Sequence, residues 1–195
     1  MYKYLFICIL LLIALQYSNN LCAQEKFEKE SRIRQKDVPV KALHFIESSD
    51  LKKSNIKWYL EEGLNKKSIE AKFKLNKVRY SIEFDTLGNV EDIEIETVWE
   101  DLNSQLKDSI SLHLKKDCLK YKIVKVQIQY SGSETALFSK LKANENNQDL
   151  TINYELIVKC TLQNKVELFE YLFSESGKPL SVSKIIFKNS SHLEY

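Results

Sequence analysis

Histidine, cysteine and carboxylate side chains are the residues of this chain whose types could support catalysis or metal binding. Histidine is scarce: His44 and His113 fall in segments with helical spacing, and His192 lies near the C-terminus. The sequence contains no Gly-x-Ser-x-Gly or Gly-x-Gly-x-x-Gly motif and no metal-ligand spacing that includes histidine. We therefore expect no catalytic residue, no metal site and no cofactor, and we interpret the helical histidines as surface or partly buried side chains.

Carboxylates gather in one stretch, which consists of Glu91, Asp92, Glu94, Glu96, Glu100 and Asp101. Such a stretch raises the question of calcium binding. However, Ile93 and Ile95 alternate with the acidic residues, and the glycine-turned loop of a typical calcium site is missing from the sequence. The alternation predicts a strand with a solvated acidic face, which we expect to pair with the basic residues Lys72, Lys74 and Arg79.

Cys118 and Cys160 are the two cysteines outside the N-terminal segment. Cys118 extends the apolar stripe of a predicted helix, and Cys160 extends the apolar face of a predicted strand. A disulfide between them and two buried free thiols both fit this pattern. A redox role is not expected, because the sequence has no Cys-x-x-Cys pair.

The N-terminus is typical of an export signal. Lys3 precedes an apolar run from Leu5 to Leu15, and Leu21-Cys22-Ala23 leads into Gln24. We predict a signal peptide over residues 1–23 with cleavage after Ala23, a periplasmic or secreted mature chain, and no stable membrane span in it. Lipid attachment at Cys22 is the alternative, although lipoprotein signals usually have a small residue where Leu21 stands.

The composition is that of an ordinary globular protein, with 44% hydrophobic and 29% charged residues. The formal net charge is +2, and basic and acidic residues are interspersed. This balance gives no electrostatic signature of a nucleic-acid-binding protein. After a charged, flexible lead-in at residues 24–36, we expect the rest of the chain to be folded.

Alternating and helical patterns predict two units of the same kind. In residues 37–99, a helix at Val38–Ser49 precedes four strands, at Asn55–Glu61, Ser68–Leu75, Val78–Asp85 and Glu91–Trp99. In residues 100–190, a helix at Leu102–Cys118 precedes strands at Lys122–Tyr130, Thr151–Cys160, Val166–Phe173 and Leu180–Lys188. When the two units are aligned at Gly88 and Gly177, Phe84 and Phe173 occupy equivalent positions, and we expect both side chains to point inward.

These patterns predict an α+β fold of two tandem repeats, each a helix packed on a four-stranded antiparallel sheet. Residues 131–149 form an insertion in the second repeat, in which Glu134–Leu141 is an extra helical turn or a strand. The layout, the "EAKF" strand and the "EFDTLGN" turn resemble the PepSY-like, β-lactamase-inhibitor-protein-like (BLIP-like) secreted proteins of Bacteroidota. The resemblance covers residues 38–187 and implies a periplasmic or secreted binding or inhibitory module.

The outer faces of the two predicted sheets differ. In the first repeat this face is charged, whereas in the second we expect an apolar patch that comprises Leu168, Leu172, Val182 and Ile186. Such a patch is either an interaction surface or a surface covered by the other repeat or the insertion. We expect a non-enzymatic exported module that binds a protein or peptide of the cell envelope. The alternative is a structural or small-ligand carrier protein with a cavity between helix and sheet.

Overall fold

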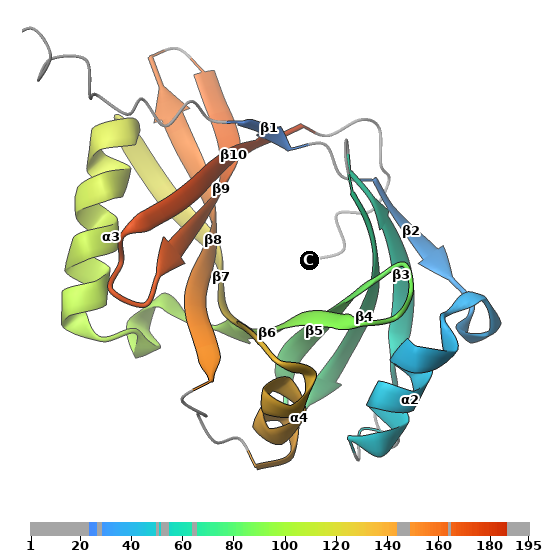
Figure 1. Cartoon of the computed structure of the whole chain (residues 1–195). Helices are drawn as coiled ribbons and strands as arrows, with labels where there is room; N and C mark the ends of the chain where they lie inside the picture. The colour runs from blue at the N-terminus through green and yellow to red at the C-terminus, as the bar shows by residue number, and fades with distance from the viewer. Residues whose placement is uncertain are drawn as a thin grey trace, which may run out of the picture.

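One β-sheet runs through the described part of the chain, and three α-helices pack against it (Figure 1). The computed structural model describes residues 24–26, 29–49, 51, 55–63, 66–143, 149–163 and 165–186. The strands are β1 (Gln24–Lys26), β2 (Lys29–Ile33), β3 (Lys57–Glu62), β4 (Lys67–Leu75), β5 (Val78–Asp85), β6 (Val90–Thr97), β7 (Lys120–Gly132), β8 (Leu150–Leu162), β9 (Lys165–Ser174) and β10 (Pro179–Ile185). The helices are α2 (Val40–Ser48), α3 (Ser104–Asp117) and α4 (Glu134–Ala143).

The ten strands lie in the order β1-β10-β9-β8-β7-β6-β5-β4-β3-β2. The prediction of two tandem repeats, each with its own four-stranded sheet, is therefore wrong. At the expected boundary β6 pairs with β7, so that Ile93 lies opposite Tyr130 and Ile95 opposite Ile128. Two separate sheets would each have left an unpaired edge there, and pairing across the boundary satisfies both edges. All neighbours are antiparallel except β1 and β10, which are parallel.

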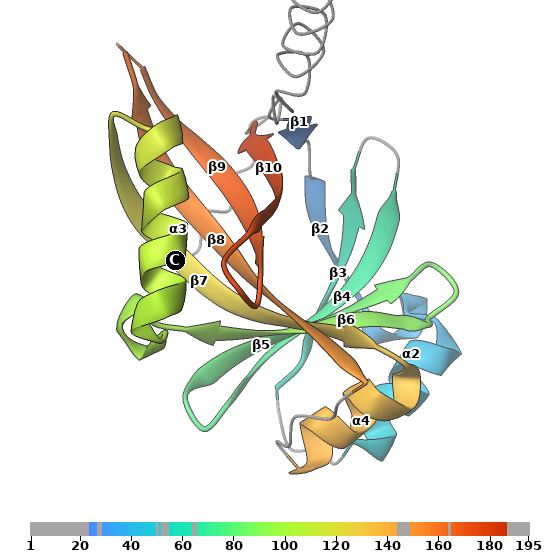
Figure 2. The same cartoon turned by 60° about the vertical axis from the view of Figure 1, so that its left-hand side comes forward.

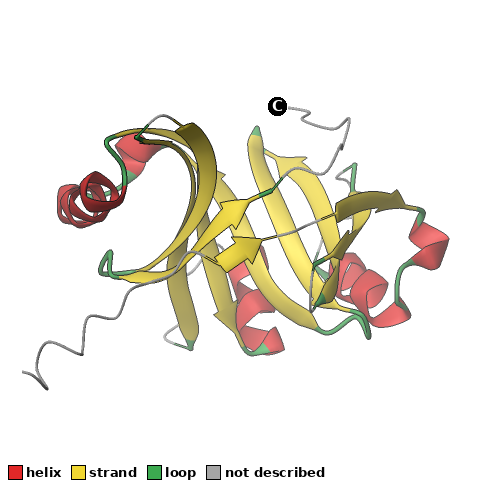
Figure 3. Ribbon diagram, turned by 90° about the horizontal axis from the view of Figure 1, so that it is seen from above, coloured by secondary structure: helices red, strands yellow, loops and turns green. Residues whose placement is uncertain are grey.

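All three helices pack on the same face of the sheet, which we call the outer face (Figures 2 and 3). Two clusters of buried side chains lie beneath them. One joins α2 and α4 to β3–β7, and the other joins α3 to β7–β9. Strand β7 belongs to both, because Tyr130 lies in the first cluster and Val126, four residues earlier on the same face, lies in the second.

The helices form where apolar residues recur at helical spacing. Ala42, Phe45 and Ile46 are the buried residues of α2, and Leu106, Ile110 and Leu114 those of α3. Helix α3 has a side-chain cap, since the backbone N–H of Leu106 donates to Oδ1 of Asn103 at 2.8 Å. Helix α2 begins after Pro39, two residues later than the helix start at Val38 that the sequence predicts.

Two glycine turns sit directly against helices. Gly88, between β5 and β6, has a φ of +86°, and a Cβ there would lie 2.8 Å from the backbone nitrogen of Ala42 in α2. Gly177, between β9 and β10, has a φ of +78°, and a Cβ there would lie 2.7 Å from Ser109 Cβ in α3. Both positions therefore need glycine for conformation and for space.

Residues 24–36 differ from their predicted structure, because they contain β1 and β2 where we expect a flexible lead-in. In the insertion at residues 131–149 the structure has the helical alternative of the prediction, since α4 forms there and its Leu137 is fully buried in the first cluster. The predicted signal peptide, including Cys22, lies outside the described residues, as does His192. Among the helices that the structure describes, none is long and apolar enough to cross a membrane.

Candidate functional site

The face opposite the helices, which we call the inner face, is polar along its centre. The strand registers bring together Glu70 and Lys72 of β4, Ser81 and Glu83 of β5, Asp92 and Glu94 of β6, Gln127 and Gln129 of β7, and Asn153 and Glu155 of β8. Each of these residues alternates with a residue that points into a core cluster. The same alternation that builds the core therefore gathers carboxylates and amides on one surface.

Several of these polar side chains are buried, although the helices all pack on the other side. Glu70 is 4% exposed, Ser81 4%, Glu94 6% and Gln127 5%. The sheet curls strongly, with the helices outside the curve (Figure 3). Curling brings the side chains of the inner face close to one another, and each then shields its neighbours from water. Buried carboxylates must be paired or protonated, because an isolated buried charge is costly.

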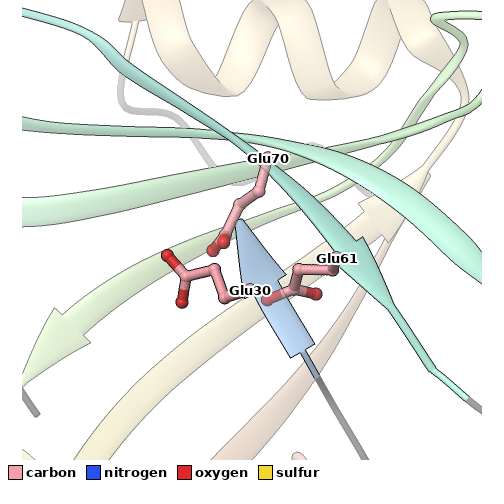
Figure 4. Close-up of side chains that lie close together, drawn as sticks. All are labelled: Glu30, Glu61 and Glu70. Carbon is pink, nitrogen blue, oxygen red and sulfur yellow. The ribbon is translucent and has the colours of Figure 1, made fainter. Parts of the chain in front are cut away.

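Glu30, Glu61 and Glu70 form the first carboxylate group on this face, and Figure 4 shows their side chains converging. Carboxylate oxygens of the three lie within 4.8 Å of one another. Lys72 neutralises part of this charge, with its Nζ 2.8 Å from Glu70 and 3.1 Å from Glu30. Burial alone would lower the pKa of Lys72, but the carboxylates of Glu70 and Glu30 raise it above its usual value. Ser81 Oγ donates a hydrogen bond to Glu70.

Glu83, Asp92 and Glu94 form a second group, the central carboxylate cluster, and their oxygens also lie within 4.8 Å of one another. Side-chain amides hold two of them. Gln127 Nε2 donates to Glu94 at 2.8 Å, and Gln129 Nε2 donates to Asp92 Oδ2 at 3.2 Å. The other Asp92 oxygen, Oδ1, is buried and has no hydrogen-bond partner. If Asp92 is protonated, this oxygen can donate to a neighbouring carboxylate.

The central carboxylate cluster favours protonation. Burial, together with the Glu83 carboxylate, raises the pKa of Asp92 to about 8. Burial, together with Asp92 and Glu83, raises the pKa of Glu94 well above its usual value. Carboxylates at this spacing share protons, and they are also the ligand type that hard cations such as Ca²⁺ take.

The sequence predicts a solvated acidic strand face, and this interpretation is wrong for Glu94, which is buried, and for Asp92, which is half-buried. The predicted pairing with basic residues holds at the rim, where Arg79 lies 3.4 Å from Glu96. Alternation identifies the face on which a side chain lies. It does not report the curvature that buries the middle of that face.

We expect Asp92→Asn to flatten the pH dependence of stability. In the wild type Asp92 is protonated when folded up to about pH 8 and ionised when unfolded above its usual pKa of 3.8. Folding therefore takes up a proton in this window, and the free energy of unfolding falls as pH rises, by at most about 1.4 kcal/mol per pH unit. Asparagine carries no such proton. Between pH 5 and pH 8 the free energy of unfolding of the variant should therefore rise, relative to that of the wild type, by about 1–3 kcal/mol.

Urea unfolding at a series of pH values checks this expectation. Parallel stability profiles for Asp92→Asn and the wild type would show that Asp92 is ionised in the folded protein.

The residues of the predicted apolar patch do not share one face. Leu168 and Leu172 are half-buried on the inner face, since Leu168 lies opposite Lys159 and Leu172 opposite Glu155. Val182 lies opposite Tyr171 and packs against the second core cluster. Ile186 is half-buried just beyond β10. A hollow of about 290 Å³ adjoins Leu168, lined also by Lys159, Val166, Glu167, Lys184 and Ile185.

Cys118 and Cys160 form a disulfide between the end of α3 and β8, with a Cα–Cα distance of 5.4 Å. Cys118 is 5% exposed and Cys160 1%. The bridge lies in the second core cluster on the outer face, so it braces α3 against the sheet and has no contact with the inner face.

The helical histidines are also away from the inner face. His44 is exposed on α2, and His113 is half-buried on α3 with its ring 6.3 Å from that of Phe173. A separate open groove of about 550 Å³ lies where the start of α3 meets β8 and the β9–β10 turn. Its lining is largely uncharged and includes Asn103, Gln105, Thr151, Asn153 and Ser176.

No protein-family model matches the chain, and no curated protein matches its sequence. Two solved structures have a similar fold. A DUF2874 family protein from Bacteroides uniformis has a TM-score of 0.52 and 9% identity, over 75% of this chain and 89% of that one. A DUF2874 family protein from Bacteroides ovatus has a TM-score of 0.50 and 11% identity, over 75% and 87%. At these identities the likeness is one of fold. Neither structure bears a PepSY-like or BLIP-like name, so that resemblance remains a prediction.

Proposed function

We propose that the protein is an exported, non-enzymatic binding module that holds a protein or peptide partner on the inner face of its sheet. One observation carries the proposal: α2, α3 and α4 all pack on the outer face, while the inner face combines half-buried leucines with a carboxylate-rich centre. A surface that mixes apolar and charged groups in this way is typical of an interface.

The N-terminal sequence supports the export part of the proposal, because a charged start, an apolar run and Ala23 follow the order of a signal peptide. The mature chain acts in the periplasm or outside the cell. N-terminal sequencing of the protein from an envelope fraction tests this directly. A first residue near Gln24 is expected, and a cytosolic product that retains Met1 would contradict export.

The character of the inner-face side chains supports a binding role over catalysis. The inner-face acids with raised pKa, Asp92 and Glu94, are held by glutamine amides, and both described histidines are on helices of the outer face. A hydrolase of the common kinds needs a nucleophile next to a base. The arrangement offers instead a fixed pattern of charge that a partner can match.

We expect the double substitution Leu168→Ser and Leu172→Ser to abolish partner binding while the protein stays folded. The two leucines are half-buried on the inner face, and an interface would remove the rest of their apolar surface from water at about 25 cal/mol per Å². The readout is a pull-down from envelope extract beside a thermal melt followed by circular dichroism.

Leu112→Ser is the matched control, because Leu112 is 57% exposed on α3. It should leave both binding and melting unchanged. A collapsed melt of the double variant would mean that Leu168 and Leu172 belong to the core, and unchanged binding would exclude them from the interface.

The open groove beside α3 favours a second candidate function, that of a small-ligand carrier. Its volume of about 550 Å³ falls in the range of ligand pockets, and its amide and hydroxyl groups suit an uncharged polar ligand. Mass spectrometry of the native protein separates the two functions, since a co-purified small molecule supports the carrier.

A further inference from the structure

Three exposed lysines lie together on the inner face, at the end where β7 begins. They are Lys120 and Lys122 of β7 and Lys159 of β8, and we call them the lysine triad. The residues that alternate with them point the other way, into the second core cluster, and are Tyr121, Ile123, Val158 and Cys160. The alternation therefore places all three lysines on the face opposite the helices.

The lysine triad concentrates positive charge that the rest of the sheet does not neutralise. Lys122 and Lys159 are direct register partners, and Lys120 lies two residues before Lys122 on the same face. Like charges directly opposite one another on neighbouring strands are destabilising. Within the described part of the chain, none of the three forms an ion pair with an acidic residue. A local arrangement that costs stability is typical of a functional site.

An apolar surface adjoins the lysine triad. Leu168 lies directly opposite Lys159, and Val166, two residues earlier on the same face, is 55% exposed. Together these three residues line part of the hollow of about 290 Å³. Pockets for drug-sized ligands occupy about 300–1,000 Å³. The hollow therefore suits one side chain of a larger partner better than a whole small molecule.

Charge and shape together favour one class of partner. Unpaired lysines attract carboxylates, whereas the carboxylate groups at the centre of the same face disfavour an acidic segment there. The two halves of the inner face thus differ in sign, and the lysine triad is the end that complements an acidic segment. The sheet curls with its helices outside the curve, so a narrow peptide chain reaches the inner face more readily than a flat lipid surface does (Figure 3).

We propose that the lysine triad and the adjoining hollow bind an acidic peptide segment of the partner, with its carboxylates over the lysines and one apolar side chain in the hollow. The biological meaning of this site rests on the proposed function, since it names the chemistry of the segment that the inner face would hold. The site itself is testable with a synthetic peptide.

The probe is the peptide acetyl-Asp-Leu-Asp-Leu-Asp-amide, and its control has asparagine in place of each aspartate. Each is titrated into the processed, disulfide-bonded protein and followed by nuclear magnetic resonance. The aspartate peptide should shift the backbone amide signals of Lys159 and Leu168, and the asparagine peptide should not. Added sodium chloride should weaken the binding, because salt screens exposed charges.

The variant Lys122→Glu separates a binding role from a structural one. It should weaken binding of the aspartate peptide about tenfold or more. It should also raise the melting temperature by about 1–3 °C, because a carboxylate would then lie directly opposite Lys159. Lys77→Glu is the matched control, since Lys77 is exposed between β4 and β5 and its replacement changes the net charge equally. It should leave the affinity unchanged.

Equal affinities of the wild type and Lys122→Glu would overturn the site, and so would an absence of shifts at Lys159 and Leu168. Phosphatidylglycerol vesicles that bind the wild type but not Lys122→Glu, without any peptide shift, would assign the lysines to a lipid and overturn the peptide. An envelope partner that binds both proteins equally would leave the proposed function standing without this site. If the peptide binds as expected but no envelope partner exists, the site stands and the proposed function fails.

Discussion

Replacing Phe84 or Phe173 by alanine is expected to lower the free energy of unfolding by about 3–5 kcal/mol in each case. Both side chains are fully buried, each in a different core cluster. The Phe84 ring lies 5.7 Å from Phe45 of α2, and the Phe173 ring lies 5.8 Å from Tyr171 of β9. Alanine would remove these contacts and leave a cavity under a helix, and the surrounding structure cannot fully close this cavity.

Denaturant unfolding followed by circular dichroism measures both variants. Because β6 pairs with β7, the two clusters share one sheet, and we expect each variant to shift a single transition of the whole domain. Leu87→Ala is the control, since Leu87 is 75% exposed and its loss should cost less than about 0.5 kcal/mol. Two separate transitions, with one variant shifting each, would contradict the continuous sheet.

Replacing both Cys118 and Cys160 by alanine is expected to lower the free energy of unfolding by about 2–4 kcal/mol. The bridge closes a loop of sequence separation 42, and its loss would raise the conformational entropy of the unfolded chain. The same variant should bind its partner as the wild type does once folded, because the bridge lies on the outer face.

Thiol titration of the unfolded, unreduced protein checks the premise of this prediction. No free thiol is expected from the processed chain. Two free thiols would show that the cysteines are unbridged in solution, and the double variant should then cost only the loss of two small buried side chains.

Local sequence patterns predicted the strands and their two faces well. The alternation at Ile69, Ala71 and Phe73 placed the core face of β4, and the same rule placed Tyr171 and Phe173 of β9. The spacing of Leu106, Ile110 and Leu114 likewise predicted α3. These features depend on neighbours within a few residues, which is the range over which a period of two or of 3.6 acts.

Long-range pairing was beyond the reach of the same patterns. Ile93 and Tyr130 have the same alternation whether or not their strands meet, so the sequence did not reveal the β6–β7 pair. Val182 was assigned to the wrong face because the register between β9 and β10 shifts between Pro179 and Ser181. A shift of one residue moves every later side chain to the opposite face.

The sequence predicted which residues belong to the candidate site, but not how deeply they are buried. The sequence identifies Asp92 and Glu94 as one face of an acidic strand, and Leu168 and Leu172 as apolar residues facing away from the core. Their convergence on one surface depends on the curl of the whole sheet (Figure 3), and alternation within a single strand carries no information about that curl.

Photo-crosslinking in living cells tests most directly the central claim that the inner face binds a partner. A photo-reactive benzoylphenylalanine replaces Leu172 on the inner face or, in a matched strain, the exposed Leu112 on α3. Irradiation should join the Leu172 variant to a discrete envelope protein or peptide, and the Leu112 variant should give no such product. A product from Leu112 with none from Leu172 would place the binding surface on the helices and contradict the account.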